Sequence, residues 1–376
     1  MTHDADGAAL LAHLRTHVHG YYDGVTPDQL RVELLTTSRH HFSKTYRFRI
    51  TGADIEQLVF AKMMCVSSRG SVALGHDRPR LAPMNDWVNM RPRSEYRSLC
   101  AASERFQRIG DPHLGAVRPL DYIAERRAIV MEVIEEPTLR QLLWKATRIA
   151  GPIKGSDLDI VFRHAGAWLR EFHQVSVDGD DVSALRERRA DVLEAFTEYG
   201  EFLAERLAAK EAFRDVVSTA LSCAPSVLPD VLPLGVGHGD FAPRNIFVSP
   251  KARVTVIDMI GRWRVPIYED LAYFVTELRA AAPQRLTYGL ALHPDRLARY
   301  ESELLAGYFD GKAIPHGAIA FFELLLLLDR WSAVVRKAGG GPTVRRAREL
   351  ATQAITNRYL LREARGLARA VAEAGT

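Results

Sequence analysis

The spacing of hydrophobic and polar positions changes about a third of the way along this 376-residue chain. Residues 8–20 have helical spacing. Three short runs rich in β-branched and aromatic residues follow between polar breaks, QLRVELLTT, KTYRFRI and QLVFAKMMCV, and they predict strands of an antiparallel sheet. A helix at 94–109, SEYRSLCAASERFQRI, and a strand within RAIVMEVIEE complete this part of the chain.

From TLRQLLWKA to about residue 226 the pattern is almost wholly helical, with breaks near GPIKGS and VDGDD. We therefore predict an α+β chain of two lobes. Residues 1–134 would form a small lobe of antiparallel sheet with one helix, and residues 135–376 a larger, mostly helical lobe. A chain of this length has enough apolar surface for a separate core in each lobe.

The stretch GHGDFAPRNIFVSPKARVTVID, residues 237–258, gathers polar residues around a predicted hairpin of NIFV and RVTVID. A turn centred near residues 250 and 251 would put Asn245 almost opposite Val256. Asp258 would then lie one diagonal step away, at roughly 7–8 Å. Asp240 lies in the loop just before the hairpin. Carboxylate and amide oxygens gathered at one opening suit Mg²⁺, which takes one or two carboxylates and completes its shell with water and phosphate.

The order of these residues resembles a known family. The stretch begins with His238, Gly239 and Asp240. Four residues separate Asp240 from Asn245, and Asp258 is the thirteenth residue after Asn245. This spacing is similar to that of the catalytic and metal loops of the protein-kinase-like superfamily. Gly239 in place of an arginine, VIDM in place of DFG and the downstream YEDLA make the chain more similar to the aminoglycoside phosphotransferase and choline kinase branch. The resemblance implies a bilobal protein-kinase-like fold and an ATP- and Mg²⁺-dependent transfer of phosphate to a hydroxyl of a small molecule.

The resemblance also implies roles for single residues. Asp240 would accept or orient the proton of the acceptor hydroxyl, and Asn245 and Asp258 would hold Mg²⁺. His238 would brace the backbone of the loop. Arg244 either meets a phosphate or buttresses the loop, and both readings stay open. Outside this loop, the aspartate of YEDLA, Asp270, is expected to hydrogen-bond the loop rather than to touch substrate.

In the first lobe the resemblance requires a strand lysine paired with a helix glutamate, to hold the nucleotide phosphates. Lys62 in LVFAKMMC fits, because a lysine inside an apolar strand is costly to bury unless it is paired. The alternative is a lysine on the solvent face of an edge strand. Glu95 is the expected partner and Glu104 the alternative. The loop Ser67–Pro92 resembles an insertion, since it lengthens the separation from Lys62.

Other nucleotide contacts are expected at two places. No glycine-rich loop is present in TTSRHHFSKTYRF, so phosphate contacts there would come from backbone N–H groups and from Ser43 or Lys44. Backbone groups near Glu132 and Val133, in IVMEVIEE, would meet the adenine edge. The Glu132 carboxylate is expected to face solvent.

Two charged segments give hints about the acceptor. Residues 178–201 contain eight acidic and three basic residues, which suits a cationic acceptor such as an aminoglycoside or choline, or else marks a solvated helix face. The tail after KAGGGP contains seven arginines and three glutamates. It is either a basic amphipathic helix at a membrane or, more commonly, a helix that packs its apolar stripe on the protein body. Aminoglycoside, amino alcohol and sugar acceptors stay open, as does a sugar or lipid-linked saccharide in surface polysaccharide metabolism.

Composition and motifs narrow the classes of protein to which the chain could belong. The net charge of +4 and the absence of a nucleic-acid motif do not indicate a nucleic-acid partner. The longest apolar run, AIAFFELLLLL, is interrupted by Glu323, and the first twenty residues lack a secretory pattern, so we expect a cytoplasmic protein without a transmembrane segment. Three cysteines without CxxC spacing predict buried free thiols. A protein kinase is disfavoured because no APE-type segment follows Asp258, and a catalytically silent binding module stays as an alternative. The sequence leaves the oligomeric state open.

Overall fold

The computed structural model of the chain describes residues 4–22, 29–40, 43–52, 55–65, 87–148, 158–176, 182–335 and 343–376. They belong to two units. The first comprises Met1–His76, Met84–Ile109 and Ala116–Glu135, and the second Asp77–Pro83, Gly110–Gly115 and Glu136–Thr376. The division into domains at residues 134 and 135 stays a prediction, to which the structure adds that Gly110–Gly115 groups with the second unit.

The first unit contains a five-stranded antiparallel sheet in the order β1-β2-β3-β6-β5. The predicted antiparallel sheet is thereby confirmed. Its strands are β1 (Arg31–Arg39), β2 (Ser43–Gly52), β3 (Ile55–Met64), β5 (Pro119–Ile123) and β6 (Ala128–Glu132). The helical segments of this unit are α1 (Ala5–His17), η1 (Val18–Gly20), α3 (Trp87–Ile109) and η3 (Ala124–Arg126).

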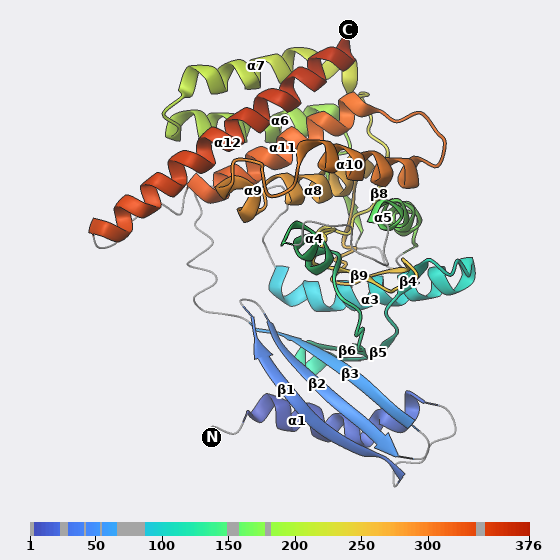
Figure 1. Cartoon of the computed structure of the whole chain (residues 1–376). Coiled ribbons are helices and arrows are strands. Elements are labelled where there is room, and N and C mark those ends of the chain that lie inside the picture. Colours follow the sequence, from blue (N-terminus) through green and yellow to red (C-terminus); the bar gives the residue numbers. More distant parts are fainter. Residues whose placement is uncertain are drawn as a thin grey trace. The chain divides into compact units, whose positions relative to one another are not determined.

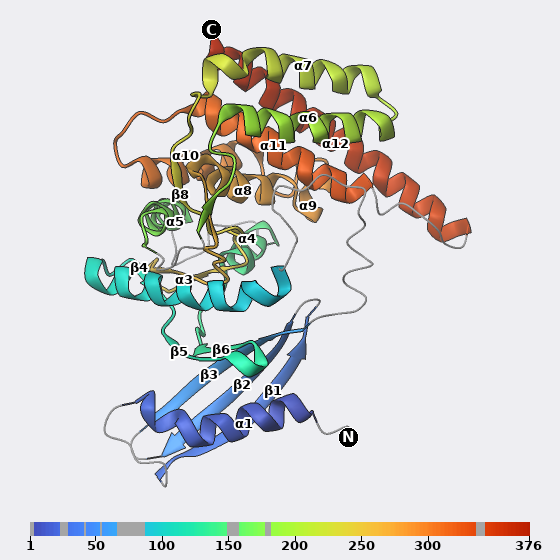
Figure 2. The same ribbon diagram turned by 180° about the vertical axis from the view of Figure 1, so that it is seen from behind.

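Helix α1 covers one face of this sheet (Figures 1 and 2). Leu10 and Leu14 of α1 share a buried cluster with Tyr46, Phe48 and Ile50, which alternate along β2. The period-2 pattern of β2 therefore turns its apolar side toward α1 and leaves the residues in between for the other face.

Helix α3 differs from the prediction, because it begins at Trp87 rather than at residue 94 and contains Pro92. A proline inside a helix lacks the N–H for one backbone hydrogen bond, and its ring clashes with the carbonyl four residues back. Helix α3 nevertheless extends through Pro92 to Ile109. The predicted insertion Ser67–Pro92 lies mostly outside the described residues.

The second unit is mostly helical. Its helices are α4 (Leu139–Arg148), α5 (Leu158–His173), α6 (Arg189–Arg206), α7 (Lys210–Val227), α8 (Ile267–Arg279), α9 (Ala282–Leu286), α10 (Pro294–Phe309), α11 (His316–Val335) and α12 (Thr343–Gly375). Its described residues also form two small sheets, with strand orders β4-β10-β9 and β7-β11-β8. Their strands are β4 (Leu114–Ala116), β7 (Ser183–Ala184), β8 (Leu234–Val236), β9 (Ile246–Val248), β10 (Val254–Val256) and β11 (Trp263–Pro266).

The predicted hairpin is present as β9 and β10, but its register differs by one residue. Val256 lies opposite Ile246, and the Ile257 N–H donates to Asn245 O at 3.0 Å. The difference arises because Ser249 and Arg253 close the turn, with a Ser249 N–H to Arg253 O bond of 3.0 Å. Ala252 adopts a φ of 58°, the left-handed residue of a three-residue hairpin loop. Asp258 therefore directly follows the residue that is bonded to Asn245.

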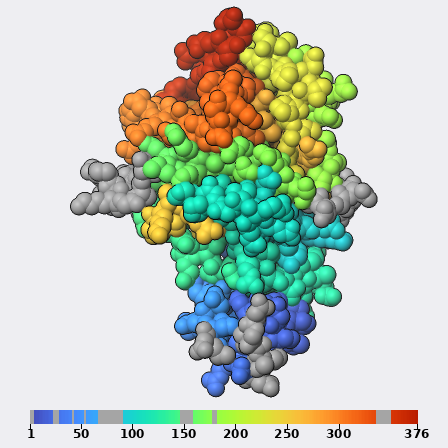
Figure 3. Space-filling view, turned by 90° about the vertical axis from the view of Figure 1, so that its right-hand side faces the viewer, coloured from blue at the N-terminus to red at the C-terminus, as the bar shows by residue number. Residues whose placement is uncertain are grey.

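The basic C-terminal helix α12 packs its apolar stripe on the body of the second unit. Tyr359, Leu360, Ala364 and Val371 are buried, and a Cβ added at Gly375 would lie 3.4 Å from Ser226 Cβ of α7. Figure 3 shows this red end of α12 beside residues of the yellow-green α7. The packed alternative for the tail is confirmed. None of the described helices combines the length and the apolar character that crossing a membrane requires.

The acidic stretch 178–201 lies largely on the outside of α6 and of the loop before it. Glu187, Asp191, Glu194, Glu198 and Glu201 are exposed. Asp178, Asp180 and Asp181 lie outside the described residues. The described acids of this stretch therefore form a solvated face.

The three cysteines, Cys65, Cys100 and Cys223, are free thiols. The prediction that they are buried is wrong, because each is half-buried. Burial raises the pKa of the Cys100 thiol.

Candidate active site

The loop at His238–Asp240 has a shape that requires glycine. Gly239 adopts a φ of 77°, and a Cβ there would come within 3.0 Å of the Ile260 Cδ1. The Ile260 N–H donates to His238 O at 2.9 Å, and the Gly261 N–H donates to Gly237 O at 3.1 Å. The loop is thereby joined to the segment that follows Asp258.

Asp270, at the start of α8, holds the same loop from the other side. Its carboxylate accepts the backbone N–H groups of His238 at 2.6 Å and Gly239 at 3.0 Å. It also contacts His173 Nε2 at 3.2 Å, and His173 Nδ1 contacts the Tyr308 hydroxyl at 2.7 Å. Burial alone would raise the pKa of Asp270, but its hydrogen bonds, with His173 first, lower it. The expectation that Asp270 bonds the loop is confirmed.

His238 is fully buried among Trp168, Phe172 and Phe241. The Asp240 N–H donates to His238 Nδ1 at 3.3 Å, which leaves the ring hydrogen on Nε2. Burial lowers the pKa of His238 and favours this neutral form. The contact with the Asp240 backbone is the one that a bracing role requires.

The Asp240 carboxylate is oriented by three side chains. Asn245 Nδ2 donates to Asp240 Oδ2 and to the Asp240 backbone oxygen, both at 2.9 Å. The Tyr273 hydroxyl donates to Asp240 Oδ1 at 2.8 Å, and Arg244 Nη2 donates to the same oxygen. With 22% of its side chain exposed, Asp240 is both fixed in direction and open to solvent.

Arg244 belongs to a chain of charges that leads away from Asp240. Its guanidinium contacts Glu277, which also pairs with Arg330, and Arg330 Nη2 donates to the Tyr273 hydroxyl at 2.5 Å. Burial would lower the pKa of Arg244, but the charge of Asp240 and its other partners raise it. These contacts are those of a positioning residue; a contact of Arg244 with phosphate stays a prediction.

Sequence reasoning did not find Tyr273, Glu277 or Arg330. A signal for the first two exists, because Asp270, Tyr273 and Glu277 are spaced i, i+3 and i+7 and share one face of α8. Arg330 follows the run LLLLLD in a buried helix, where a charged residue needs a partner.

The donor set of the hairpin fits a magnesium ion. Because Asn245 Nδ2 is used by Asp240, its Oδ1 is the remaining acceptor of the amide. Asp258 is half-buried and adopts a φ of 63°, an uncommon conformation for a residue other than glycine. Across the described ranges no three His, Cys, Asp or Glu side chains cluster as a metal site. Mg²⁺ needs no such cluster, since phosphates and water supply its other ligands.

In the first unit, Lys62 and Glu95 form a buried ion pair. Lys62 Nζ lies 2.6 Å from Glu95 Oε1, and the two residues are 7% and 3% exposed. Arg91 Nε lies 3.7 Å from Glu95 Oε2, whereas Glu104 is exposed. The structure thus pairs Lys62 with Glu95 rather than with Glu104.

The structure does not bring Lys44 to the face of the sheet that carries Lys62. Lys44 lies opposite Met63 in the register, and Thr45 lies opposite Lys62. Adjacent residues of a strand point to opposite faces, and Lys44 Nζ accordingly pairs with Asp6 of α1 at 2.6 Å. Ser43 lies two residues before Thr45, so its side chain points to the same face of the sheet as Lys62, and it stays a candidate for a phosphate contact. His41 and Phe42 of the same turn lie outside the described residues.

The two backbone N–H groups at the end of β6 that were predicted to meet the adenine edge already have hydrogen-bond partners in the protein. The Glu132 N–H donates to Arg118 O at 3.1 Å, and the Val133 N–H donates to Leu58 O at 3.0 Å. Both donors are therefore engaged within the sheet. The Glu132 carboxylate is not free in solvent, since Arg118 Nη1 donates to it at 3.1 Å.

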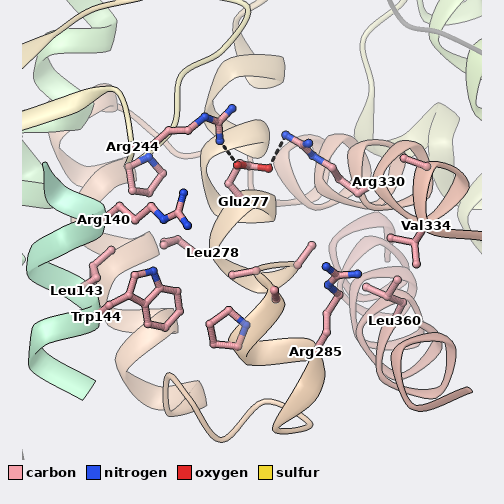
Figure 4. A pocket seen from close by; sticks show the side chains of 16 residues that line it. Arg140, Leu143, Trp144, Arg244, Glu277, Leu278, Arg285, Arg330, Val334 and Leu360 are labelled. Carbon is pink, nitrogen blue, oxygen red and sulfur yellow. Dashed lines mark hydrogen bonds and ion pairs between the residues drawn. The ribbon is translucent and has the colours of Figure 1, made fainter. Parts of the chain in front are cut away.

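A cavity of about 510 Å³ lies beside Arg244 in the second unit (Figure 4). Its charged lining consists of Arg140, Arg244, Arg285, Arg330 and Glu277. The other lining residues are apolar: Leu143, Trp144, Pro243, Leu278, Ala280, Ala281, Ala282, Pro283, Ala333, Val334 and Leu360.

Comparisons with known proteins complete the description of the site. Residues 71–304 match the model of a family described as the phosphotransferase enzyme family. No curated protein matches the sequence. Among solved structures, the macrolide 2′-phosphotransferase of Brachybacterium faecium is 15% identical, with a TM-score of 0.51 and coverage of 93% of this chain and 98% of that chain.

Two further structures share the fold. The ethanolamine kinase of Plasmodium vivax is 10% identical, with a TM-score of 0.50 over 92% of this chain and 86% of that chain. A glucosamine kinase in complex with glucosamine, ADP and inorganic phosphate is 16% identical, with a TM-score of 0.50 over 97% of this chain and 83% of that chain. At these identities the likeness establishes the bilobal kinase-like fold.

Proposed function

This chain belongs to the phosphotransferase enzyme family and is a small-molecule phosphotransferase with an alcohol group as acceptor, and we propose that ATP with Mg²⁺ is its phosphate donor. The observation that carries the proposal is the Asp240 carboxylate, which Asn245 and Tyr273 orient next to the β9–β10 hairpin. Asp258 lies two residues beyond the end of β10. The glucosamine kinase with the same fold was solved with ADP, which supports an adenine nucleotide.

In the proposed reaction an oxygen of the acceptor hydroxyl attacks the γ-phosphorus of ATP. A new O–P bond forms as the bond between that phosphorus and the β–γ bridging oxygen breaks, and ADP leaves with the bond electrons. The hydroxyl proton passes to the Asp240 carboxylate. Phosphoryl transfer has a loose transition state, so the main task of the residue is to aim the hydroxyl. Asp240, held by three donors, is built for that task.

Asn245 Oδ1 and the Asp258 carboxylate would hold the metal. A bound Mg²⁺ neutralises charge on the nucleotide phosphates during transfer. Asn245 also keeps its Nδ2 on Asp240. One amide would therefore set both the direction of Asp240 and the place of an oxygen ligand.

The Lys62–Glu95 pair would bind the nucleotide phosphates. The pair is buried and short, and Glu95 holds the lysine ammonium in one position. Ser43 would add a contact from the same face of the sheet. Because the N–H groups of Glu132 and Val133 are engaged, the adenine edge would meet neighbouring backbone groups. A cytoplasmic location stays an expectation, and the oligomeric state stays unassigned.

The test is a screen of the intact chain for ADP formation from ATP with amino alcohols, sugars, aminoglycosides and hydroxy acids. Transfer to one acceptor class is expected, with a loss of at least about 10³-fold in kcat for Asp240→Asn and nearly unchanged ATP binding. For the metal, Asp258→Asn should remove the effect of Mg²⁺ on ADP affinity measured by calorimetry. ADP formation that is equal in wild type and Asp240→Asn would contradict the proposal.

A catalytically silent binding module is the second candidate function. It predicts ADP binding without transfer to any acceptor. The oriented Asp240 argues against it, since a module without turnover has no need for three donors on one half-buried carboxylate.

A further inference from the structure

The cavity beside the candidate active site, lined by Arg140, Arg244, Arg285 and Arg330, is named here the arginine cavity. We propose that the phosphate acceptor of this enzyme is an anion: a hydroxylated small molecule that carries a carboxylate or a phosphate group bound by these arginines. The inference rests on the proposed function and adds the charge of the substrate.

The charges of the arginine cavity do not cancel. Glu277 is the single acid among its lining residues, and both Arg244 and Arg330 contact it. Arg244 also contacts Asp240. Within the part of the chain that the structure describes, no carboxylate lies within ion-pair distance of Arg140 or Arg285. Both guanidinium groups line the cavity without an acid partner; Arg140 is exposed to solvent, and Arg285 is half-buried.

Arg285 gives a second and independent indication. Its Nε is buried and has no hydrogen-bond partner among the described residues. Burial, followed by the charge of Arg330, lowers the pKa of Arg285. A buried donor without an acceptor destabilises the protein, and an anionic oxygen would satisfy it. Figure 4 shows Arg285 and Arg140 on opposite walls of the cavity.

The remaining lining suits a small carbon skeleton. Trp144 and Leu143 come from α4, Leu278 from α8 and Leu360 from α12. A volume of about 510 Å³ lies in the range of small-molecule sites. The planar fork of arginine matches carboxylate and phosphate oxygens in a bidentate manner. A flat tryptophan with arginines on facing walls thus fits a compact polyhydroxy acid or a phosphorylated sugar or polyol.

The position of the cavity connects it to the reaction. Arg244 lines the cavity and contacts Asp240 through the same guanidinium. An acceptor whose anionic end is held by Arg140 and Arg285 would therefore extend its hydroxyl toward Asp240. None of the acidic residues of α6 lines this cavity. The hint of a cationic acceptor consequently has no support at the site itself.

The experiment compares acceptors matched in skeleton and different in charge. ADP formation by the intact chain is measured with glycerate, 3-phosphoglycerate and glycerol, and with glucuronate, glucose 6-phosphate, glucose and glucosamine. Choline and kanamycin represent the cationic class. Calorimetry with the same compounds, in the presence of MgADP, measures binding separately from transfer.

We expect at least one anionic compound to have a kcat/KM at least tenfold above that of its neutral and cationic counterparts. Comparison of the compounds that carry a carboxylate with those that carry a phosphate then identifies which anionic group the site binds. Arg285→Met and Arg140→Met should each raise the KM for that anion at least tenfold and leave the KM for ATP within twofold. Arg214→Met, an exposed arginine of α7, is the matched control and should change neither constant.

Transfer that prefers a neutral or cationic acceptor would overturn the inference and leave the proposed function intact. Anion binding that is equal in wild type and Arg285→Met, or absent for every anion at millimolar concentration, would also overturn it. Anion binding that requires Arg285, without Asp240-dependent ADP formation from any acceptor, would support the anion site and contradict the proposed function.

Discussion

The Asp270 carboxylate accepts the His238 backbone N–H at 2.6 Å, and so a residue of α8 holds the loop that ends at Asp240. The hydrogen bond links two segments 32 residues apart in the sequence. It means that the direction of Asp240 depends on a carboxylate that does not itself contact Asp240. The first prediction concerns this bond.

Asp270→Asn should lower kcat by a factor on the order of 10², because an amide cannot accept both loop N–H groups as a carboxylate does, and a small displacement of a catalytic group has this effect. The KM for ATP should stay nearly constant, which a purely structural role would not predict. Tyr308→Phe removes only the bond to His173 Nδ1 and should have a much smaller effect. Steady-state kinetics measures both. Equal losses in kcat for the two variants would contradict the assignment.

Tyr273→Phe should reduce kcat while the protein stays folded. The change removes one donor to Asp240 and the acceptor of the Arg330 bond. With Asn245 still in place, the expected loss is about 1–2 kcal/mol of transition-state stabilisation, a factor of roughly 5–30. Tyr268→Phe is the control, since Tyr268 is on the same helix and packs against Phe322. A kcat for Tyr273→Phe equal to that of the control would show that the hydroxyl does not orient Asp240.

Lys62→Met should destabilise the protein by about 3–5 kcal/mol, because it leaves the buried Glu95 without its lysine. The double variant Lys62→Met with Glu95→Gln should regain a large part of this loss, since neither charge of the pair is then left buried without the other, although Arg91 loses Glu95 as a partner. Urea unfolding of the wild type, both single variants and the double variant measures the coupling. Additive effects of the two changes would mean that the pair does not stabilise the fold.

Glu323→Gln should make the protein more stable at neutral pH. Glu323 is fully buried, and burial, with Glu301 nearby, raises its pKa well above the usual value of 4.5. A raised pKa in the folded state means that the stability linked to this proton is complete below about 4.5 and is lost as the pH rises through the folded-state pKa. The glutamine mimics the protonated acid and avoids that loss.

The advantage of Glu323→Gln over the wild type should therefore shrink as the pH falls toward 4.5. Arg279, which lies 3.0 Å from Glu323, keeps Glu301 as a partner in the variant. The difference in unfolding free energy between the two proteins, measured at several pH values, cancels other titrating groups. A difference that does not change with pH would refute the raised pKa.

Several elements of the fold and the site could be predicted because their causes are local. The alternation of Tyr46, Phe48 and Ile50 in β2 needs only a period of two and one apolar face. The β9–β10 hairpin was predicted from its strands and turn residues, but its register was not. The register depends on whether Ser249 pairs with Arg253, and Ala252 had to adopt a left-handed conformation that its residue type does not favour.

By itself the sequence determined the α+β pattern, the order of Asp240, Asn245 and Asp258, and the need to pair a lysine in an apolar strand. Only the tertiary structure decided that Arg140, Arg285 and Arg330 line one cavity and that Glu277 neutralises part of their charge. These residues lie on helices separated by up to 190 positions. Periodicity shows which face of a helix is buried. The charge of a cavity depends on which helices pack together, and only the long-range packing of the folded chain determines which helices are neighbours.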